Sequence, residues 1–387
     1  MESRLTAPRA ASALFAATVA GLSIILLAAS ACRTARPNLA PRPEALGFPL
    51  MEAGALRFEG AANRPVRARY GEAYFTTDEG ALYDIDVLSR RTLWTFRAEA
   101  PIPVAPELCG DSVVIRDERN TIYVIDTRGR LTFKAAAAGA LTTAVRENGG
   151  RLYYGCGDGR VTAVGLRDGR PAWEHRTGSA VLSGPVFSGG LVVFGTADGR
   201  LLAVDGDGLP AWTFAARGAV RADPAAADGG LFFGTADGFF YGLAAATGKK
   251  RWAFRLAGEP LAAPVAAAGR RLVLAASDSV VYCLSARSGE ILWWRGVPSR
   301  AVHAPAVADG LVIVSAFSPD VSAYDLRNGL PSGACRAGAD LQAGAQWVTP
   351  YLVLIEPDPD RGGQRMVFLE RDRRPFETLG QANPVRR

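Results

Sequence analysis

The sequence has few of the residues from which most enzyme sites are built. Its 387 residues include only two histidines, His175 and His303, which lie far apart and have no partner motif. A histidine-based zinc site or a Ser-His-Asp triad therefore has little material. We expect each histidine to lie on the surface or to sit in the core with its hydrogen bonds made. The sequence predicts no catalytic residue, no metal site and no cofactor.

Closely spaced cysteines are also missing. The five cysteines are Cys32, Cys109, Cys156, Cys283 and Cys335, and no Cys-Cys or Cys-x-x-Cys string occurs. An oxidising compartment would permit disulfides among the last four. Because they fall in different repeat units, we expect isolated buried thiols instead.

Lysine is scarce, with Lys134, Lys249 and Lys250 making 3 of the 44 basic residues. The net charge is +6, and the arginines are scattered along the chain. A nucleic-acid binder is expected to cluster its positive charge. The composition therefore indicates no nucleic-acid partner.

The longest uncharged apolar run stands at the N-terminus. Ala10 to Ala31 follows Arg4 and Arg9, which is the pattern of an export signal. The run ends "AASAC", which fits both an ordinary signal-peptidase site and a lipoprotein box with Cys32 as the lipidated residue, although Ala29 stands where Leu is usual. An uncleaved anchor is a third interpretation, because a run of this length spans a bilayer. We assign residues 1–31 to a signal peptide and predict lipid on Cys32.

A proline-rich stretch follows the predicted lipid site. It contains Pro37, Pro41, Pro43 and Pro49. Such a segment stays extended and does not join a sheet ladder easily. Residues 32–53 are therefore interpreted as the lipidated cysteine and a tether.

The rest of the chain repeats with a period near forty. Asp198-Gly199 recurs as Asp237-Gly238, and Trp212 recurs as Trp252. Each unit contains four short β-rich runs separated by turn dipeptides. Four strands per forty residues is typical of a propeller blade. We predict an all-β fold, an eight-bladed β-propeller of four-stranded antiparallel blades over residues 54–380.

The ends of units three to six are alike, reading "GRPAW", "GLPAW", "GKKRW" and "GEILW". They resemble the tryptophan-docking repeat A-x-D-x-x-T-G-x-x-x-W of PQQ-type (quinoprotein-like) propellers, over about residues 64–378. In that family the tryptophan wedges between neighbouring blades. The resemblance assigns this structural role to Trp94, Trp173, Trp212, Trp252 and Trp293, with Phe133 in unit two and Gly333 in unit seven at the same place. We expect the last four tryptophans to be largely buried.

A lipid-anchored eight-bladed propeller of this length is similar to the BamB family of outer-membrane lipoproteins. That resemblance implies a non-enzymatic scaffold on the periplasmic side of the outer membrane, a monomer within a complex. It would bind BamA, the barrel-forming subunit, and help deliver unfolded outer-membrane proteins. No stretch outside the repeat matches that family's partner contacts.

Two other functions stay open. A PQQ-dependent dehydrogenase usually shows an adjacent Cys-Cys pair or a haem-binding Cys-x-x-Cys-His, and neither string is present. A periplasmic or surface binding or sensor module outside barrel assembly would use the broad face or the channel of a propeller.

Two further expectations concern the chain ends. A propeller has to join its last blade to its first, or it leaves open edges. "GALRF", Gly54 to Phe58, resembles the fourth-strand string "PAWTF", so we predict that residues 55–59 form the outer strand of blade eight. The acidic string "EPDPDRGG", from Glu356 to Gly363, is expected to be a solvated loop rather than a cation site.

Overall fold

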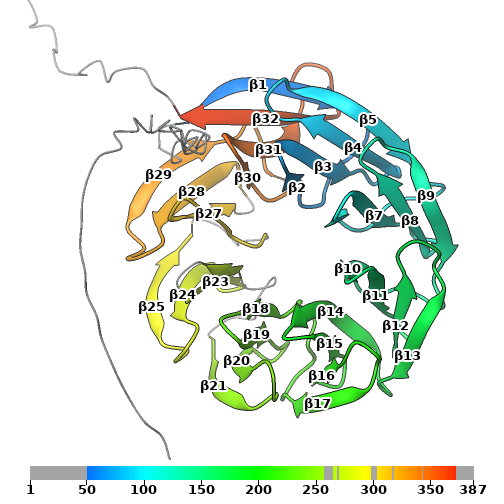
Figure 1. Cartoon of the computed structure of the whole chain (residues 1–387). Helices are drawn as coiled ribbons and strands as arrows, with labels where there is room; N and C mark the ends of the chain where they lie inside the picture. The colour runs from blue at the N-terminus through cyan, green and yellow to red at the C-terminus, as the bar shows by residue number, and fades with distance from the viewer. Residues whose placement is uncertain are drawn as a thin grey trace, which may run out of the picture. The chain divides into compact units, whose positions relative to one another are not determined.

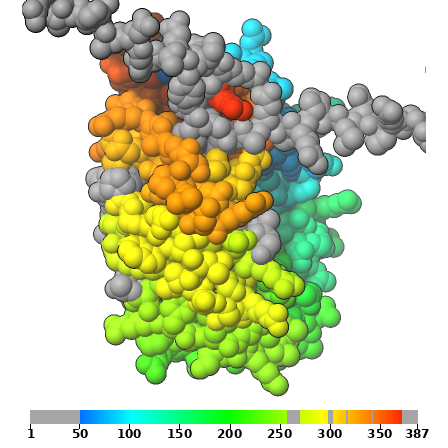
Figure 2. Space-filling model, turned by 90° about the vertical axis from the view of Figure 1, so that its left-hand side faces the viewer, coloured from blue at the N-terminus to red at the C-terminus, as the bar shows by residue number. Residues whose placement is uncertain are grey.

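The computed structural model describes residues 50–256, 265–267, 270–297, 303–315, 318–341 and 343–371. In these residues every regular element is a β-strand. The strands form eight four-stranded antiparallel sheets that follow one another around a ring (Figure 1). Seen from the side, consecutive segments lie next to one another along the rim (Figure 2). The predicted eight-bladed propeller is confirmed.

The blades follow the chain order, except that blade 8 contains both ends. Blade 1 contains β2 (Arg67–Arg69), β3 (Glu72–Thr76), β4 (Ala81–Asp86) and β5 (Arg91–Arg97); blade 2 contains β6 (Glu107–Cys109), β7 (Ser112–Arg116), β8 (Thr121–Asp126) and β9 (Leu131–Ala136); blade 3 contains β10 (Arg146–Asn148), β11 (Arg151–Gly155), β12 (Arg160–Gly165) and β13 (Pro171–Arg176); blade 4 contains β14 (Val181–Ser188), β15 (Leu191–Thr196), β16 (Arg200–Val204) and β17 (Pro210–Ala215). Blade 5 contains β18 (Ala225–Ala227), β19 (Gly230–Gly234), β20 (Phe239–Ala244) and β21 (Lys250–Arg255); blade 6 contains β22 (Val265–Ala267), β23 (Arg271–Ala276), β24 (Val280–Ser285) and β25 (Ile291–Gly296); blade 7 contains β26 (Ala306–Ala308), β27 (Leu311–Ser315), β28 (Asp320–Asp325) and β29 (Pro331–Arg336); blade 8 contains β30 (Gln346–Val348), β31 (Tyr351–Pro357), β32 (Gln364–Arg371) and β1 (Leu50–Phe58).

The core lies between blades rather than inside one sheet. The middle strands are nearly continuous apolar runs because a neighbouring blade covers each face, as in β16, whereas the outer strand β17 alternates in exposure. One cluster joins Val193 and Leu201 of blade 4 to Phe233 and Tyr241 of blade 5. Each blade therefore completes the core of its neighbour, which is why the sequence has to repeat.

The ring has two different ends. At the first, called the turn end, the first strand of each blade turns into the second and the third turns into the fourth; Leu166 N–H donates to Gly150 O there. At the second, called the linker end, the second strand turns into the third and the chain passes to the next blade. Ala216 N–H donates to Gly199 O at that end.

The Asp-Gly corners lie at the linker end and are used for turn chemistry. Gly199 has φ +84°, and a Cβ there would lie 2.9 Å from the carbonyl oxygen of Gly218. The Asp198 carboxylate accepts hydrogen bonds from Thr196 Oγ1 at 2.6 Å and from Arg200 Nε at 2.8 Å. The corner thus needs glycine for its backbone and aspartate for its own side-chain hydrogen bonds.

The two ends of the described chain meet in blade 8. β1 pairs antiparallel with β32 as the outermost strand, so the predicted closing strand is confirmed, and it runs from Leu50 to Phe58. The comparison of "GALRF" with "PAWTF" places Leu56 at the tryptophan position, which is two residues from the position that the structure shows. Both strands have a bulge, and the register places Gly54 opposite Phe368, where blade 4 has Trp212 opposite Ala203. Gly54, not Leu56, occupies the tryptophan position.

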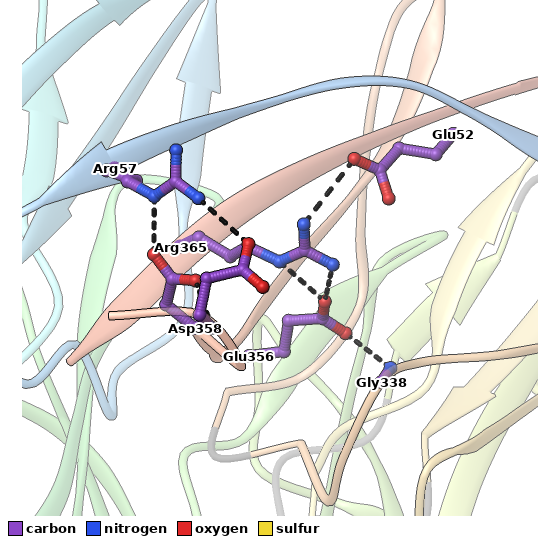
Figure 3. A network of polar contacts seen from close by, with 7 residues as sticks. Glu52, Arg57, Gly338, Glu356, Asp358 and Arg365 are labelled. Atoms are coloured by element: carbon purple, nitrogen blue, oxygen red, sulfur yellow. Dashed lines mark hydrogen bonds and ion pairs between the residues drawn. The ribbon is translucent and has the colours of Figure 1, made fainter. Parts of the chain in front are cut away.

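A network of ion pairs fastens this closure (Figure 3). Arg365 of β32 donates to Glu356 of β31 at 2.6 and 2.9 Å and lies 3.6 Å from Glu52 of β1. The other oxygen of Glu356 accepts the N–H of Gly338, which follows blade 7, at 2.6 Å. The buried carboxylate therefore links both chain ends to the preceding blade.

The acidic string from Glu356 to Gly363 was expected to be a solvated loop. This expectation is wrong for two of its three carboxylates, as a second contact of the network shows. Arg57 Nε of β1 donates to Asp358, and its Nη2 lies 3.3 Å from Asp360. Glu356 is only 2% exposed and Asp358 only 5%. The hydrogen bond from Arg57 lowers the pKa of Asp358. The acidic string is therefore part of the network of ion pairs that joins β1 to β31 and β32, which is called the clasp below.

Candidate binding surfaces and blade joints

The five assigned tryptophans all reach the following blade. Each indole N–H donates to a main-chain carbonyl in the turn before the next outer strand, at 2.8 to 3.1 Å. The pairs are Trp94 with Thr127, Trp173 with Gly206, Trp212 with Ala245, Trp252 with Ala286, and Trp293 with Leu326. The glycine and the tryptophan of the repeat thus take part in successive joints.

The rings lie directly on the repeat glycines. A Cβ on Gly208 would stand 2.6 Å from the ring of Trp173, and one on Gly248 would stand 2.5 Å from the ring of Trp212. Phe133 packs in the same way on Gly169. The glycine is needed because any side chain would push the ring of the preceding blade away.

Burial of these rings is complete for only one of them. Trp293 is 5% exposed, whereas Trp94, Trp173, Trp212 and Trp252 are of intermediate exposure. The joint lies at the rim of the propeller, so one edge of each of these rings stays in contact with solvent. A partly exposed ring contributes less to stability than a core ring does.

The joint between blades 8 and 1 has a small residue where other joints have the tryptophan and a large residue where they have the glycine. Blade 8 has Gly54 at the tryptophan position, and blade 1 has Arg90, with φ +55°, where other blades have glycine. A Cβ on Gly54 would lie 3.1 Å from Arg90 Nε, and the Arg90 guanidinium lies 6.0 Å from the centre of the Tyr351 ring. The replacement of glycine four residues before Trp94 is the sequence signal for this joint.

The remaining singled-out residues do not come together. Cys32 lies outside the described residues. Cys109, Cys156, Cys283 and Cys335 are free thiols in blades 2, 3, 6 and 7. Burial raises the pKa of Cys156 and of Cys283 to about 11, so these thiols are poor nucleophiles.

The two histidines lie in blade 3 and at the start of blade 7. His175 is of intermediate exposure on β13. Nε2 of His303 is buried and has no hydrogen-bond partner in the described ranges, and burial lowers the pKa of this ring. The expectation of a satisfied histidine is therefore wrong for His303. Within the described ranges, no group of three or more His, Cys, Asp or Glu side chains is placed to hold a metal ion.

A cavity of about 470 Å³ opens in the central channel, where the first strands of blades 1 to 4 meet Pro224 and Ala226 of blade 5. Its lining is charged on three blades, through Arg67, Glu107 and Arg146, and apolar on the next, through Val186 and Phe187. Arg146 is held by Asp223 at 2.7 Å, and burial raises the pKa of Glu107. This lining can bind a ligand with polar and apolar parts, but it offers no nucleophile beside a base.

Blade 1 contains a buried carboxylate that sequence reasoning missed. Asp84 is fully buried opposite Trp94 on β4, where blade 4 has Ala203 opposite Trp212. Neither carboxylate oxygen has a hydrogen-bond partner among the described residues. Burial, and then the nearby charge of Glu72, raise the pKa of Asp84 to about 7. The signal was an aspartate inside the apolar third strand "ALYDID".

No helix long and apolar enough to cross a membrane was found in the part of the chain that the structure describes.

Comparison with known proteins gives a family match over the repeats. The family model for outer membrane protein assembly factor BamB matches residues 59–183, 157–263 and 241–332. Two curated relatives carry the same name. The one from Bordetella pertussis (strain Tohama I) is 26% identical over 137 residues, and the one from Nitrosomonas eutropha (strain C91) is 32% identical over 140 residues. These matches cover 34% and 35% of this chain, and they span 36% and 34% of the relatives, about a third of their length.

Solved structures show the same fold at low identity. BamB from Moraxella catarrhalis superposes with a TM-score of 0.70 and 17% identity, over 83% of this chain and 99% of that one. A europium-containing methanol dehydrogenase superposes with a TM-score of 0.68 and 11% identity, over 83% and 93% of the two chains. Structural likeness at these identities does not separate scaffold from enzyme. The matches of the family model together extend from residue 59 to residue 332, more than half of the chain, and the protein therefore belongs to the outer membrane protein assembly factor BamB family.

Proposed function

We propose that this protein is a non-enzymatic envelope lipoprotein that binds proteins as a scaffold during outer-membrane β-barrel assembly. The observation that carries the proposal is the family match over residues 59–332. The partner would be a BamA-like barrel subunit, and unfolded outer-membrane proteins would be the cargo. Lipid on Cys32 would hold the propeller at the periplasmic side of the outer membrane.

The residues of the described ring support a binding role over catalysis. The four cysteines there lie in four different blades, so they cannot form the adjacent pair expected beneath a quinone. The channel cavity is lined by Arg, Glu and apolar side chains. Arg146, one of the two arginines in its lining, donates to Asp223 and to the carbonyl of Pro185 at 3.0 Å. These contacts fix the wall of the channel.

The central test is recovery of partners under native anchoring. The tagged protein is purified from membranes in mild detergent, and the co-purifying proteins are identified by mass spectrometry. A large outer-membrane barrel with periplasmic domains should be recovered in near-equal amount. Depleting the protein should also lower the level of folded barrels in the outer membrane. Neither effect would be seen for a sensor module outside barrel assembly, and such a result would refute the proposal.

The absence of quinone chemistry is tested separately. Purified protein incubated with PQQ and calcium should show no stable change in absorbance and no dye-linked oxidation of alcohols. Turnover under these conditions would place the chain with the dehydrogenases that share its fold.

A further inference from the structure

Large apolar side chains that face solvent gather at one end of the ring. Nine such residues occur in the described ranges, and eight of them lie at the turn end or at the start of an outer strand there. They are Tyr70, Leu88, Leu93, Leu131, Leu209, Ile291, Leu292 and Leu330, exposed by 44 to 95%. The ninth, Trp294, lies midway along β25. Scattered single apolar residues are normal on a surface, but their segregation to one end indicates that this end meets a less polar phase.

Four of these side chains stand at the tips of turns. Tyr70 is 95% exposed and holds a left-handed conformation, φ +52°, in the turn between β2 and β3. Leu88, Leu209 and Leu330 are 56 to 64% exposed in the turns before the outer strands of blades 1, 4 and 7. Blades 1, 4 and 7 are spread around the ring, so the tips lie on several sides of it rather than in one groove. A broad surface fits this distribution better than a single peptide does.

Cations accompany the apolar tips. The turns before the outer strands of blades 2, 3, 5, 6 and 7 each present an exposed cation with no ion-pair partner among the described residues: Arg128, Arg167, Lys249, Arg287 and Arg327. Three acidic residues of these turns, Asp126, Asp168 and Asp325, accept main-chain N–H groups of their own turns, whereas Glu290 in the turn of blade 6 is exposed. Blades 1 and 4 differ: Arg90 in the turn of blade 1 is only partly exposed, and the turn of blade 4 has no cation, although its Asp207 lies 3.9 Å from Arg151.

The chain enters the propeller at this same end. Leu50, the first residue of β1, pairs with Arg371 at the turn end of β32. Only 18 residues (50 − 32) separate it from Cys32. A fully extended segment of that length reaches about 60 Å. The segment that would carry an acyl chain on Cys32 therefore joins the propeller at the turn end.

We infer that the turn end docks directly on a membrane surface that contains anionic lipid. Tyr70, Leu88, Leu209 and Leu330 would enter the headgroup region, and the five cations would lie beside the phosphates. This gives a second membrane contact beside the acyl anchor, and weak surface contacts of this kind add to a lipid anchor. The inference concerns lipid and does not depend on any protein partner.

Vesicle binding tests it without the anchor. The mature chain, residues 32–387, with Cys32→Ser is mixed with vesicles of phosphatidylethanolamine and phosphatidylglycerol, or with vesicles of phosphatidylcholine alone, and sedimented. We expect binding to the first and on the order of tenfold weaker binding to the second, with the difference removed at high salt. Failure to bind either kind of vesicle would overturn the inference.

Matched variants locate the contact. Replacing Tyr70, Leu88, Leu209 and Leu330 together by Ser should weaken binding at least on the order of tenfold. Replacing Arg128, Arg167 and Arg327 by Ser should strongly reduce the preference for anionic vesicles. A control with Arg119, Arg255 and Arg361 changed to Ser at the linker end should bind as the parent does. All changed side chains are exposed, and equal unfolding midpoints will show that the ring is intact.

Two outcomes would contradict the assignment. If the turn-end and linker-end variants bind vesicles equally, the contact is general electrostatic attraction. If no variant binds vesicles but the turn-end variants lose the barrel subunit in the pull-down, the turn end is a protein interface. In that second case the proposed scaffold function survives and the lipid contact does not.

Discussion

At the scale of single residues, Asp84 works against the stability of the fold. It is a fully buried carboxylate without hydrogen-bond partners, close to Glu72, Tyr74 and Arg69 on blade 1. An unpaired buried charge costs free energy, and the group responds by holding its proton to higher pH. Blade 4 has Ala203 at the equivalent position, so the repeat itself does not require the charge.

Asp84→Asn should therefore stabilise the protein in a pH-dependent way. The pKa of Asp84 is raised from 3.8 to about 7 in the folded state, so the parent loses stability as pH rises between these values. The gain of the variant over the parent should be nearly absent at pH 4 and largest above pH 7, about 2 kcal/mol. Urea unfolding at several pH values measures it. Asp111→Asn at an exposed turn is the control, and a gain independent of pH would contradict the assignment.

Replacing the clasp residue Arg365 should lower the stability of the protein, whereas replacing Asp84 should raise it. Arg365→Met leaves Glu356, which is 2% exposed, without its cation. Breaking a buried pair by removing one partner costs about 3–5 kcal/mol. The double variant Glu356→Met with Arg365→Met should recover much of that loss, because no uncompensated charge remains. Thermal unfolding of the two variants compares them, and equal losses would show that the pair itself, not the stranded carboxylate, is responsible.

At the scale of strands and joints, the tryptophans should not be equivalent. Trp293→Ala removes a ring that is 5% exposed and should cost about 3–5 kcal/mol. Trp94→Ala removes a partly exposed ring and should cost about 1–3 kcal/mol. Chemical unfolding of both variants gives the comparison. Equal losses would mean that the carbonyl hydrogen bond, which both rings make, dominates over burial.

The outer strand β1 should matter to the whole ring. Deleting residues 50–58 exposes the edge of β32 and removes Arg57 and Glu52 from the clasp. We expect loss of cooperative unfolding and a tendency to aggregate, because an open edge pairs with other chains. Light scattering and a denaturant titration report both. A deletion variant as stable as its parent would show that seven complete blades suffice.

The elements show how far the sequence alone leads. The forty-residue period and the Gly-x-x-x-Trp ends determine the strands and joints because the same packing problem is solved in every blade. What differs between blades could not be read this way. At one joint, Arg90 stands where other blades have glycine and Gly54 stands where they have tryptophan. Glu356 is buried between Arg365 and Gly338, which come from different segments. Such contacts depend on which distant residues meet, and the repeat pattern does not encode that.

At the scale of the whole molecule, the membrane anchor remains a prediction about Cys32. Cys32→Ser should leave the protein in the soluble fraction after membranes are washed at high salt, because the wash removes the weak surface contact proposed for the turn end. The parent should require detergent. Fractionation followed by immunoblotting distinguishes them. Retention of the Ser variant until detergent is added would instead support an uncleaved anchor at residues 10–31.

The pairing of β1 with β32 also imposes an order in time. During synthesis and export the strand made first has to wait for the strand made last, since β32 ends at Arg371. Blades 1 to 7 can form as their residues emerge, but blade 8 cannot. A chain interrupted before residue 364 would expose both the bare strand β1 and the uncovered face of blade 7, a state that invites degradation. Only chains that reach β32 can close, so the position of the seam makes ring closure a check on synthesis of the whole propeller.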